Sequence, residues 1–168
     1  MSIASKKYQN AILYLCKRQN GALYGKKKLA KLLYYVDFDR YEYKESGVSV
    51  TGDKYTKLPM GPVPDHYMDV VKALVESGKL VVGQQEYVPG YSPVEVYTCK
   101  AEPDMTVFDE DDKAILDRVS AIYGGLNGKQ LEELSHAEAP FVGTEPSKEI
   151  AYELAYYRET QFNGISKP

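Results

Sequence analysis

The stretch 26–44 constrains the fold more than any other part of the sequence. Its apolar and amphipathic positions recur at helical spacing, as Leu29, Leu32, Leu33, Val36 and Arg40. The i, i+3, i+4, i+7 pattern predicts a long amphipathic helix. The first turn of this helix consists of lysines, which the helix dipole does not favour. A solvated lysine face explains them without any function, and a functional reason for them stays open.

Four other segments are expected to be helical. They are 3–19, ended by Asn20-Gly21; 64–77, with Pro64 at its first position and Gly78 at its end; 110–123, capped by Asp109; and 128–136, where Asn127 and Gln130 form a capping box. Ser147 is expected to cap a last helix over 148–160.

The strand signals are short. Val48, Val50 and Tyr55 indicate strand pieces broken at Gly52, and the runs 80–88 and 94–99 predict a hairpin with a loop around residues 89–93. The chain is therefore expected to form a mainly helical α+β domain. Its helices pack around a small antiparallel sheet or hairpin, and the elements follow a winged-helix-like order. We expect one domain over residues 1–160 and a frayed tail over 161–168.

Composition excludes several classes of protein. The net charge of −3 argues against a generally basic, phosphate-binding surface. No apolar run approaches the length of about 18 residues that spans a bilayer. Cys16 and Cys99 are the only cysteines, too few for a zinc site, and Cys16 lies on the apolar face of its helix. These features predict a bacterial-type cytoplasmic protein with two reduced thiols.

No catalytic pattern emerges from the residues. The stretch 21–27 resembles a phosphate-binding loop, but it has three residues between its glycines and no hydroxyl after the lysine. His66 and His136 lack a serine-nucleophile motif. Asp37 and Asp39 lie two apart on a helix and so face different ways. We expect no enzyme activity, no cofactor and no metal.

Nucleic-acid binding is the alternative that the pattern leaves open. A winged-helix-like order with Lys26, Lys27, Lys28 and Lys31 would suit a DNA surface. The helix expected to enter the groove, however, begins with Asp65 and Asp69, which would repel phosphates. DNA contact is therefore the less favoured reading.

Three blocks of the sequence, in this order and spacing, resemble the Panacea domain. They are 28–38 (KLAKLLYYVDF), 47–64 with its Thr51-Gly52, Tyr55 and Met60-Gly61-Pro62-Val63-Pro64, and 134–141 (LSHAEAPF). The family tends to have an aromatic residue, often Trp, after the last proline, where this chain has Phe141. The resemblance spans about residues 5–155. Panacea domains occur in SocA-like antitoxins and in phage-associated GepA-like proteins.

The resemblance implies a member of a toxin–antitoxin system that neutralises a cognate toxin by direct protein–protein contact. Family members pair with unrelated toxins, and some act as adaptors that deliver the toxin to a protease. Others carry an added DNA-binding domain. The expected partner is thus a toxin protein of unknown identity, with a protease as a further partner on the adaptor route and no membrane.

The corner at Gly61-Pro62 is the predicted centre of the contact site. A rigid turn loses little entropy on binding, and nearby tyrosines supply aromatic anchors. The candidate partner-binding residues are Tyr34, Tyr35, Asp37, Tyr41, Thr51, Gly52, Tyr55, Met60, Gly61, Pro62 and His136. A purely structural role remains equally open, in which Gly61-Pro62 only turns the chain into the next helix.

Overall fold

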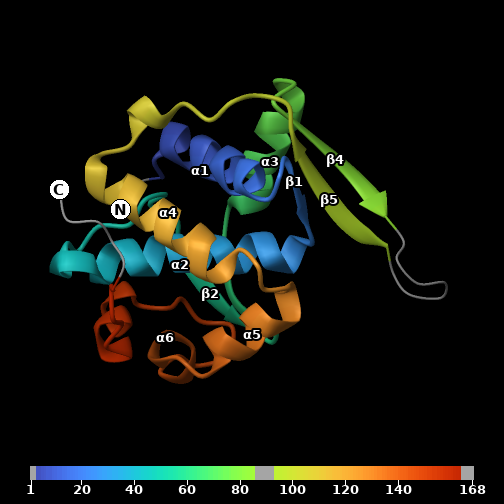
Figure 1. Cartoon of the computed structure of the whole chain (residues 1–168). Helices are drawn as coiled ribbons and strands as arrows, with labels where there is room; N and C mark the ends of the chain where they lie inside the picture. Colours follow the sequence, from blue (N-terminus) through green and yellow to red (C-terminus); the bar gives the residue numbers. More distant parts are fainter. Residues whose placement is uncertain (1–2, 86–92, 164–168) are drawn as a thin grey trace.

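A single helix, α2, runs through the middle of the molecule, and the other elements are arranged around it (Figure 1). The computed structural model describes residues 3–85 and 93–163. Its helices are α1 (Ser5–Arg18), α2 (Lys26–Glu42), α3 (Tyr67–Glu76), α4 (Glu110–Tyr123), α5 (Gly128–His136) and α6 (Ala139–Val142). Its strands are β1 (Ala22–Tyr24), β2 (Tyr55–Leu58), β3 (Gly61–Pro64), β4 (Leu80–Gln85) and β5 (Val94–Cys99). Short 3₁₀ segments cover Tyr43–Glu45, Met105–Val107 and Tyr152–Arg158.

Helix α2 is buried on all sides, which explains why it organises the rest. Every residue from Leu29 to Glu42 is buried. The helices α1, α3 and α4 lie on one side of it, and β2, α5, α6 and the C-terminal segment lie on the other (Figure 1). Because α2 has no solvated face beyond its first turn, its charged side chains must find partners inside the protein.

Two small antiparallel sheets complete the fold. The first has the order β1-β5-β4, and its β4–β5 hairpin projects from the helical body (Figure 1). The second is the β2–β3 hairpin, in which Tyr55 lies opposite Pro64 and Leu58 opposite Gly61. The predicted class, a mainly helical α+β domain with a small antiparallel sheet, is confirmed. The loop predicted around residues 89–93 lies almost wholly outside the described residues.

The capping signals identified the helices that they mark. The Asp109 carboxylate accepts a hydrogen bond from the Asp112 amide, and the Asp112 carboxylate accepts one from the Asp109 amide. Asn127 and Gln130 form the same reciprocal pair at the start of α5. Each pair satisfies two amides that would otherwise lack partners at a helix end.

Two expectations about local structure were wrong. Pro64 does not begin a helix, because Pro62 and Pro64 belong to β3 and α3 starts only at Tyr67. Val48 and Val50 are not in strands, since a side chain of α2 holds this segment as a loop. The stretch 21–27 contains β1, whose three residues pair with β5.

The predicted last helix, 148–160, is also absent. Ser147 has a φ of 66° and therefore cannot cap a helix in the usual extended conformation. The amide of Ser147 instead donates to the carbonyl of Lys57, and that of Ile150 donates to Tyr55, so this segment lies along β2. Only Tyr152–Arg158 coils, as a 3₁₀ helix.

The predicted frayed tail begins with two residues that contact the domain. The Gln161 carbonyl accepts a hydrogen bond from Arg118, and the Phe162 ring lies under the Arg118 guanidinium and beside Tyr43. Residues 164–168 lie outside the described part of the chain. The domain boundary at residue 160 stays a prediction.

Arg158 ties the C-terminal segment to α2. Its side chain is 3% exposed, and its guanidinium lies 2.7 Å from Asp39, 2.8 Å from Glu42 and 3.4 Å from Glu138. Arg118 of α4 also reaches Asp39, at 2.7 Å. One arginine thus neutralises carboxylates from α2 and from the α5–α6 turn, which fixes the C-terminal segment in place.

None of the helices in the described ranges is long and apolar enough to cross a membrane.

We expect Arg158→Met to lower the free energy of unfolding by about 3 kcal/mol, because it leaves buried carboxylates without their main donor. Urea denaturation followed by circular dichroism measures this change. Lys148→Met is the control, since Lys148 is exposed in the same segment and should change stability by less than about 0.5 kcal/mol. Equal stability of the two variants would contradict the assigned role of Arg158.

Candidate functional site

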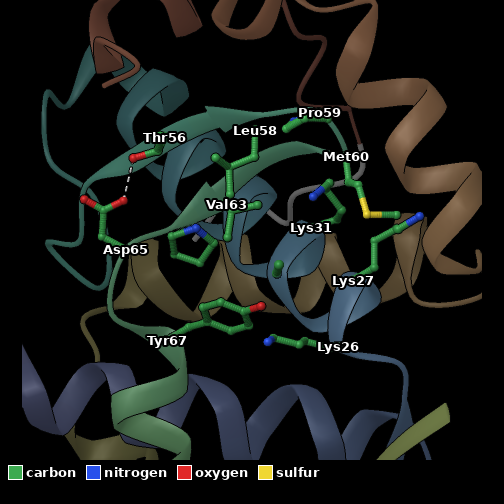
Figure 2. A pocket seen from close by; sticks show the side chains of 12 residues that line it. Lys26, Lys27, Lys31, Thr56, Leu58, Pro59, Met60, Val63, Asp65 and Tyr67 are labelled. Atoms are coloured by element: carbon green, nitrogen blue, oxygen red, sulfur yellow. Dashed lines mark hydrogen bonds between the residues drawn. The ribbon is translucent and has the colours of Figure 1, made fainter. Parts of the chain in front are cut away.

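An open groove of about 930 Å³ lies between the first turns of α2 and the β2–β3 hairpin (Figure 2). Helix α2 contributes Lys26, Lys27, Ala30 and Lys31. The hairpin contributes Leu58, Pro59, Met60 and Val63. Tyr67, the first residue of α3, closes one end beside Lys26 (Figure 2). The lining is mostly apolar, with the cationic ends of lysines along one side.

The hairpin tip is the most exposed apolar part of the groove. Met60 is 52% exposed and Leu58 is 38% exposed. Exposed apolar side chains that gather beside a groove mark an interaction site more often than isolated ones do. Methionine also adapts its shape to different partners. The geometry therefore suits a binding surface for an apolar segment.

Gly61 is required by a close approach between β3 and α2. Its φ is +115°, a conformation that side chains rarely adopt, and a Cβ there would lie 2.5 Å from Lys31 Cε. The Lys31 ammonium donates to the Pro62 carbonyl at 3.1 Å. The Gly61-Pro62 corner thus packs over Lys31, behind the residues that line the groove, and it has a structural role.

Lys31 is a buried cation. The residue is 1% exposed, and burial lowers the pKa of its ammonium to about 8, while Lys27 lowers it further and Glu132 opposes the shift. Burying a charge with a single hydrogen bond costs free energy. Such a cost is tolerated more readily at a functional site than elsewhere in a fold.

Asp37 holds the loop that leads into the hairpin. One carboxylate oxygen accepts from the amides of Val50 and Thr51, at 2.9 and 2.8 Å. The other accepts from the hydroxyls of Thr51 and Tyr55, both at 2.6 Å. Burial raises the pKa of Asp37 to about 6, and these four hydrogen bonds limit the rise. The carboxylate therefore fixes where β2 begins.

A second buried carboxylate, Asp53, fixes the far end of the same segment. It accepts from the Tyr8 hydroxyl at 2.5 Å and from the His66 amide at 2.8 Å, and it pairs with His66 Nδ1 at 2.8 Å. The Tyr152 hydroxyl donates to its backbone carbonyl at 2.6 Å. Both ends of the 51–66 segment are thus attached to the core by carboxylates.

The predicted Tyr-rich contact surface is not on the surface. Tyr34, Tyr35 and Tyr55 are at most 1% exposed, and Tyr41 is 8% exposed. Their rings pack with Phe38, Tyr123 and Tyr152 instead. Tyrosine suits both core edges and interfaces, so its frequency in the sequence did not separate the two.

The other predicted residues divide into supporting and lining positions. Asp37, Thr51 and Gly52 are buried in the loop attachment and reach the groove only through the hairpin that they position. Met60 lines the groove, and Gly61-Pro62 packs behind it.

His136 lies apart from the groove lining. Its ring stacks on Phe141 at 4.2 Å, and its Nε2 has no hydrogen-bond partner in the described ranges. The ammonium of Lys57, in β2, lies over the Phe141 ring, 4.2 Å from its centroid. A role of any candidate residue in binding a partner stays a prediction.

Sequence reasoning missed Lys31, Leu58, Val63 and Tyr67 as groove residues. Lys31 was grouped with the lysines of the first turn as a solvated or DNA-facing residue. It lies one turn further into a helix whose neighbouring positions are nearly all Leu, Tyr, Ala or Val. A lysine in such surroundings has little solvated face available, and this signal could have marked it as buried.

The described residues contain no cluster of His, Cys, Asp and Glu that could hold a metal ion.

The chain forms a small, mainly helical α+β domain with an open groove, and comparison with known families identifies its kind. Residues 29–141 match the family described as antitoxin SocA-like, Panacea domain. Because this match covers more than half of the 168 residues, the chain belongs to that family. No curated protein and no solved structure matches the chain significantly. The matched range contains α2 from Leu29 onward, both hairpins and Phe141, so it includes the groove lining except Lys26 and Lys27.

We expect Asp37→Asn to lower the free energy of unfolding by about 3 kcal/mol, because an amide nitrogen would face donors that now share a carboxylate. Thr51→Val removes one of the four hydrogen bonds to Asp37 and the acceptor of the Asp53 amide, and it should cost about 1–2 kcal/mol. Urea denaturation of the two variants measures the difference. Asp37→Asn that unfolds at the same urea concentration as the wild type would refute the role of this carboxylate.

We expect Lys31→Met to raise the free energy of unfolding by about 1–3 kcal/mol near pH 7, because it removes a buried charge. This advantage should shrink as the pH rises from about 8 to 10.5, where the folded wild type has lost the Lys31 proton and the unfolded chain still holds it. Urea denaturation across this pH range tests both points. A variant less stable than the wild type, or a difference that does not change with pH, would count against the buried cation.

Proposed function

We propose that this protein is an antitoxin that neutralises a cognate toxin by direct protein–protein contact, and that the groove between α2 and the β2–β3 hairpin is its docking surface. Family membership supports the antitoxin role. The observation that carries the docking surface is the exposed Leu58–Met60 tip beside a mostly apolar groove. The tip is presented by a segment that is anchored at both ends by buried carboxylates.

A fixed apolar surface is what binding by contact requires. The hairpin is attached to α2 through Asp37 and through Lys31, and its outer edge is covered by residues 147–150. Little conformational freedom is left in the hairpin to be lost on binding, so more of the contact free energy appears as affinity. The groove needs no catalytic group to act in this way.

DNA contact is not proposed, although the elements follow a winged-helix-like order. The exposed positions at and before α3 include Asp65, Asp69 and Glu76 against Lys72. Carboxylates at this helix would repel the phosphates of a DNA groove. A salt-sensitive mobility shift with duplex DNA would argue for the alternative.

The test is co-expression with the product of the neighbouring gene, scored by growth and co-purification. We expect the wild type to restore growth and to co-purify with that product. Immunoblotting of the toxin separates two modes of action: an unchanged level indicates blocking, and a falling level indicates delivery to a protease. Failure of growth rescue and co-purification together would overturn the proposed function.

We expect Met60→Asp to weaken toxin binding by about a hundredfold, because it places a charge at the apolar centre of the groove. Titration of the purified toxin against each variant by calorimetry measures this. Val142→Asp is the matched control, since Val142 is exposed on α6 and does not line the groove. Equal weakening by both variants would show that the groove is not the docking surface.

A further inference from the structure

One side of the groove carries positive charge that the protein itself compensates poorly. Lys26, Lys27 and Lys31 line it, and the first turn of α2 contains no acidic residue and no side-chain cap. Lys27 has a distant partner in Glu132, at 3.5 Å, whereas Lys26 has no ion pair or side-chain hydrogen bond among the described residues. The only carboxylate in the lining is Asp65, which accepts a hydrogen bond from Thr56 at 2.7 Å.

The buried end of this charge is Lys31. An ammonium group has three donors, and Lys31 uses one of them, toward the Pro62 carbonyl. No acceptor for the other two is present in the described ranges. Glu132 already favours the charged form of Lys31, and a carboxylate in the groove would stabilise it further, because the charge of a buried group is screened less than that of an exposed one.

The apolar side of the groove faces these lysines. Leu58, Met60 and Val63 extend from the hairpin toward the space that Lys26 and Lys27 border (Figure 2). The chain as a whole has a net charge of −3, so this local excess of cations is not a general property of its surface. The groove therefore combines an apolar surface with a site for a negatively charged group, so that one short segment of a partner can contact both.

We propose that the groove binds a segment of the toxin that presents an apolar side chain to Leu58 and Met60 and a carboxylate to the exposed Lys26, with the buried charge of Lys31 attracting the same carboxylate from below. This inference rests on the proposed function and specifies the chemistry of the partner. Charge complementarity selects an acidic segment over a basic one. The apolar hairpin tip selects a segment with a large apolar side chain over a wholly charged one.

The test is selection of short random peptides, displayed on phage, against the purified full chain. We expect the selected peptides to contain Asp or Glu close to a large apolar residue. Synthetic versions should bind in fluorescence anisotropy, and Lys26→Glu and Lys31→Met should each weaken that binding by about tenfold or more. Raised salt should weaken it further, chiefly through the exposed Lys26.

Lys72→Glu is the matched control, because Lys72 is exposed on α3, lies outside the groove lining and undergoes the same change of charge as Lys26. Binding to this variant should stay within about twofold of the wild type. Circular dichroism confirms the fold of each variant. If Lys31→Met does not fold, peptide binding by Lys26→Glu alone tests the inference, because Lys26 is exposed and its substitution should leave the fold intact.

Three outcomes would overturn the inference: selection that enriches no acidic residue, selection that yields no binder, or peptides that bind the lysine variants as tightly as the wild type. Self-association of the wild type that Lys26→Glu abolishes would assign the groove to a second copy instead. Peptide binding without toxin rescue would leave the groove chemistry in place and refute the antitoxin role. Toxin rescue that persists in both lysine variants would refute only the groove chemistry.

Discussion

The central constraint on this structure is that α2 is buried on every side and still carries charged residues. Most of these charges have partners that come from other parts of the chain. Asp37 accepts hydrogen bonds from the 50–55 segment. Asp39 forms ion pairs with arginines of α4 and of the C-terminal segment, and Arg40 pairs with Asp112 of α4 at 2.8 Å. Removing one partner would leave an uncompensated buried charge, which is far more costly than an exposed one. The order of charges along α2 therefore determines which elements surround it.

The groove is a direct consequence of this arrangement. Asp37 fixes the start of β2, and Lys31 lies one and a half turns earlier on the same helix beneath β3. Gly61 allows the strand to pass over the lysine at a positive φ, where a Cβ would also crowd the end of the Lys31 side chain. The hairpin tip then projects beyond the helix with Leu58 and Met60 exposed. The buried lysine reduces the stability of the free protein, and a partner with a carboxylate would offset that cost.

How far the sequence predicts this structure depends on the kind of signal. Apolar spacing and capping pairs located α1, α2, α4 and α5, because both signals are local. The hairpin β2–β3 was missed because it contains two prolines, which are uncommon in strands unless the strand lies at an edge. The three-residue β1 is too short to show an alternating pattern. The last segment has no regular spacing, since its position is fixed by the ion pairs of Arg158.

Of the residues predicted to bind a partner, Met60 is the one that lies in the groove lining, and whether the groove binds a partner stays a prediction. The Met60-Gly61-Pro62 corner does line or support the groove. The tyrosines expected around it are core residues, because a helix without a solvated face buries every ring that it carries. The role of Asp37 depends on residues up to 18 positions away, and only the folded chain shows which donors reach it.

Hydrogen–deuterium exchange of the protein, alone and mixed with the toxin from the neighbouring gene, tests the central claim most directly. The account predicts slower exchange on binding for the amides of residues 26–28 and 58–61, which border the groove, with little change in the β4–β5 hairpin. Protection confined to the β4–β5 hairpin or to α3, with unchanged exchange around the groove, would contradict the account.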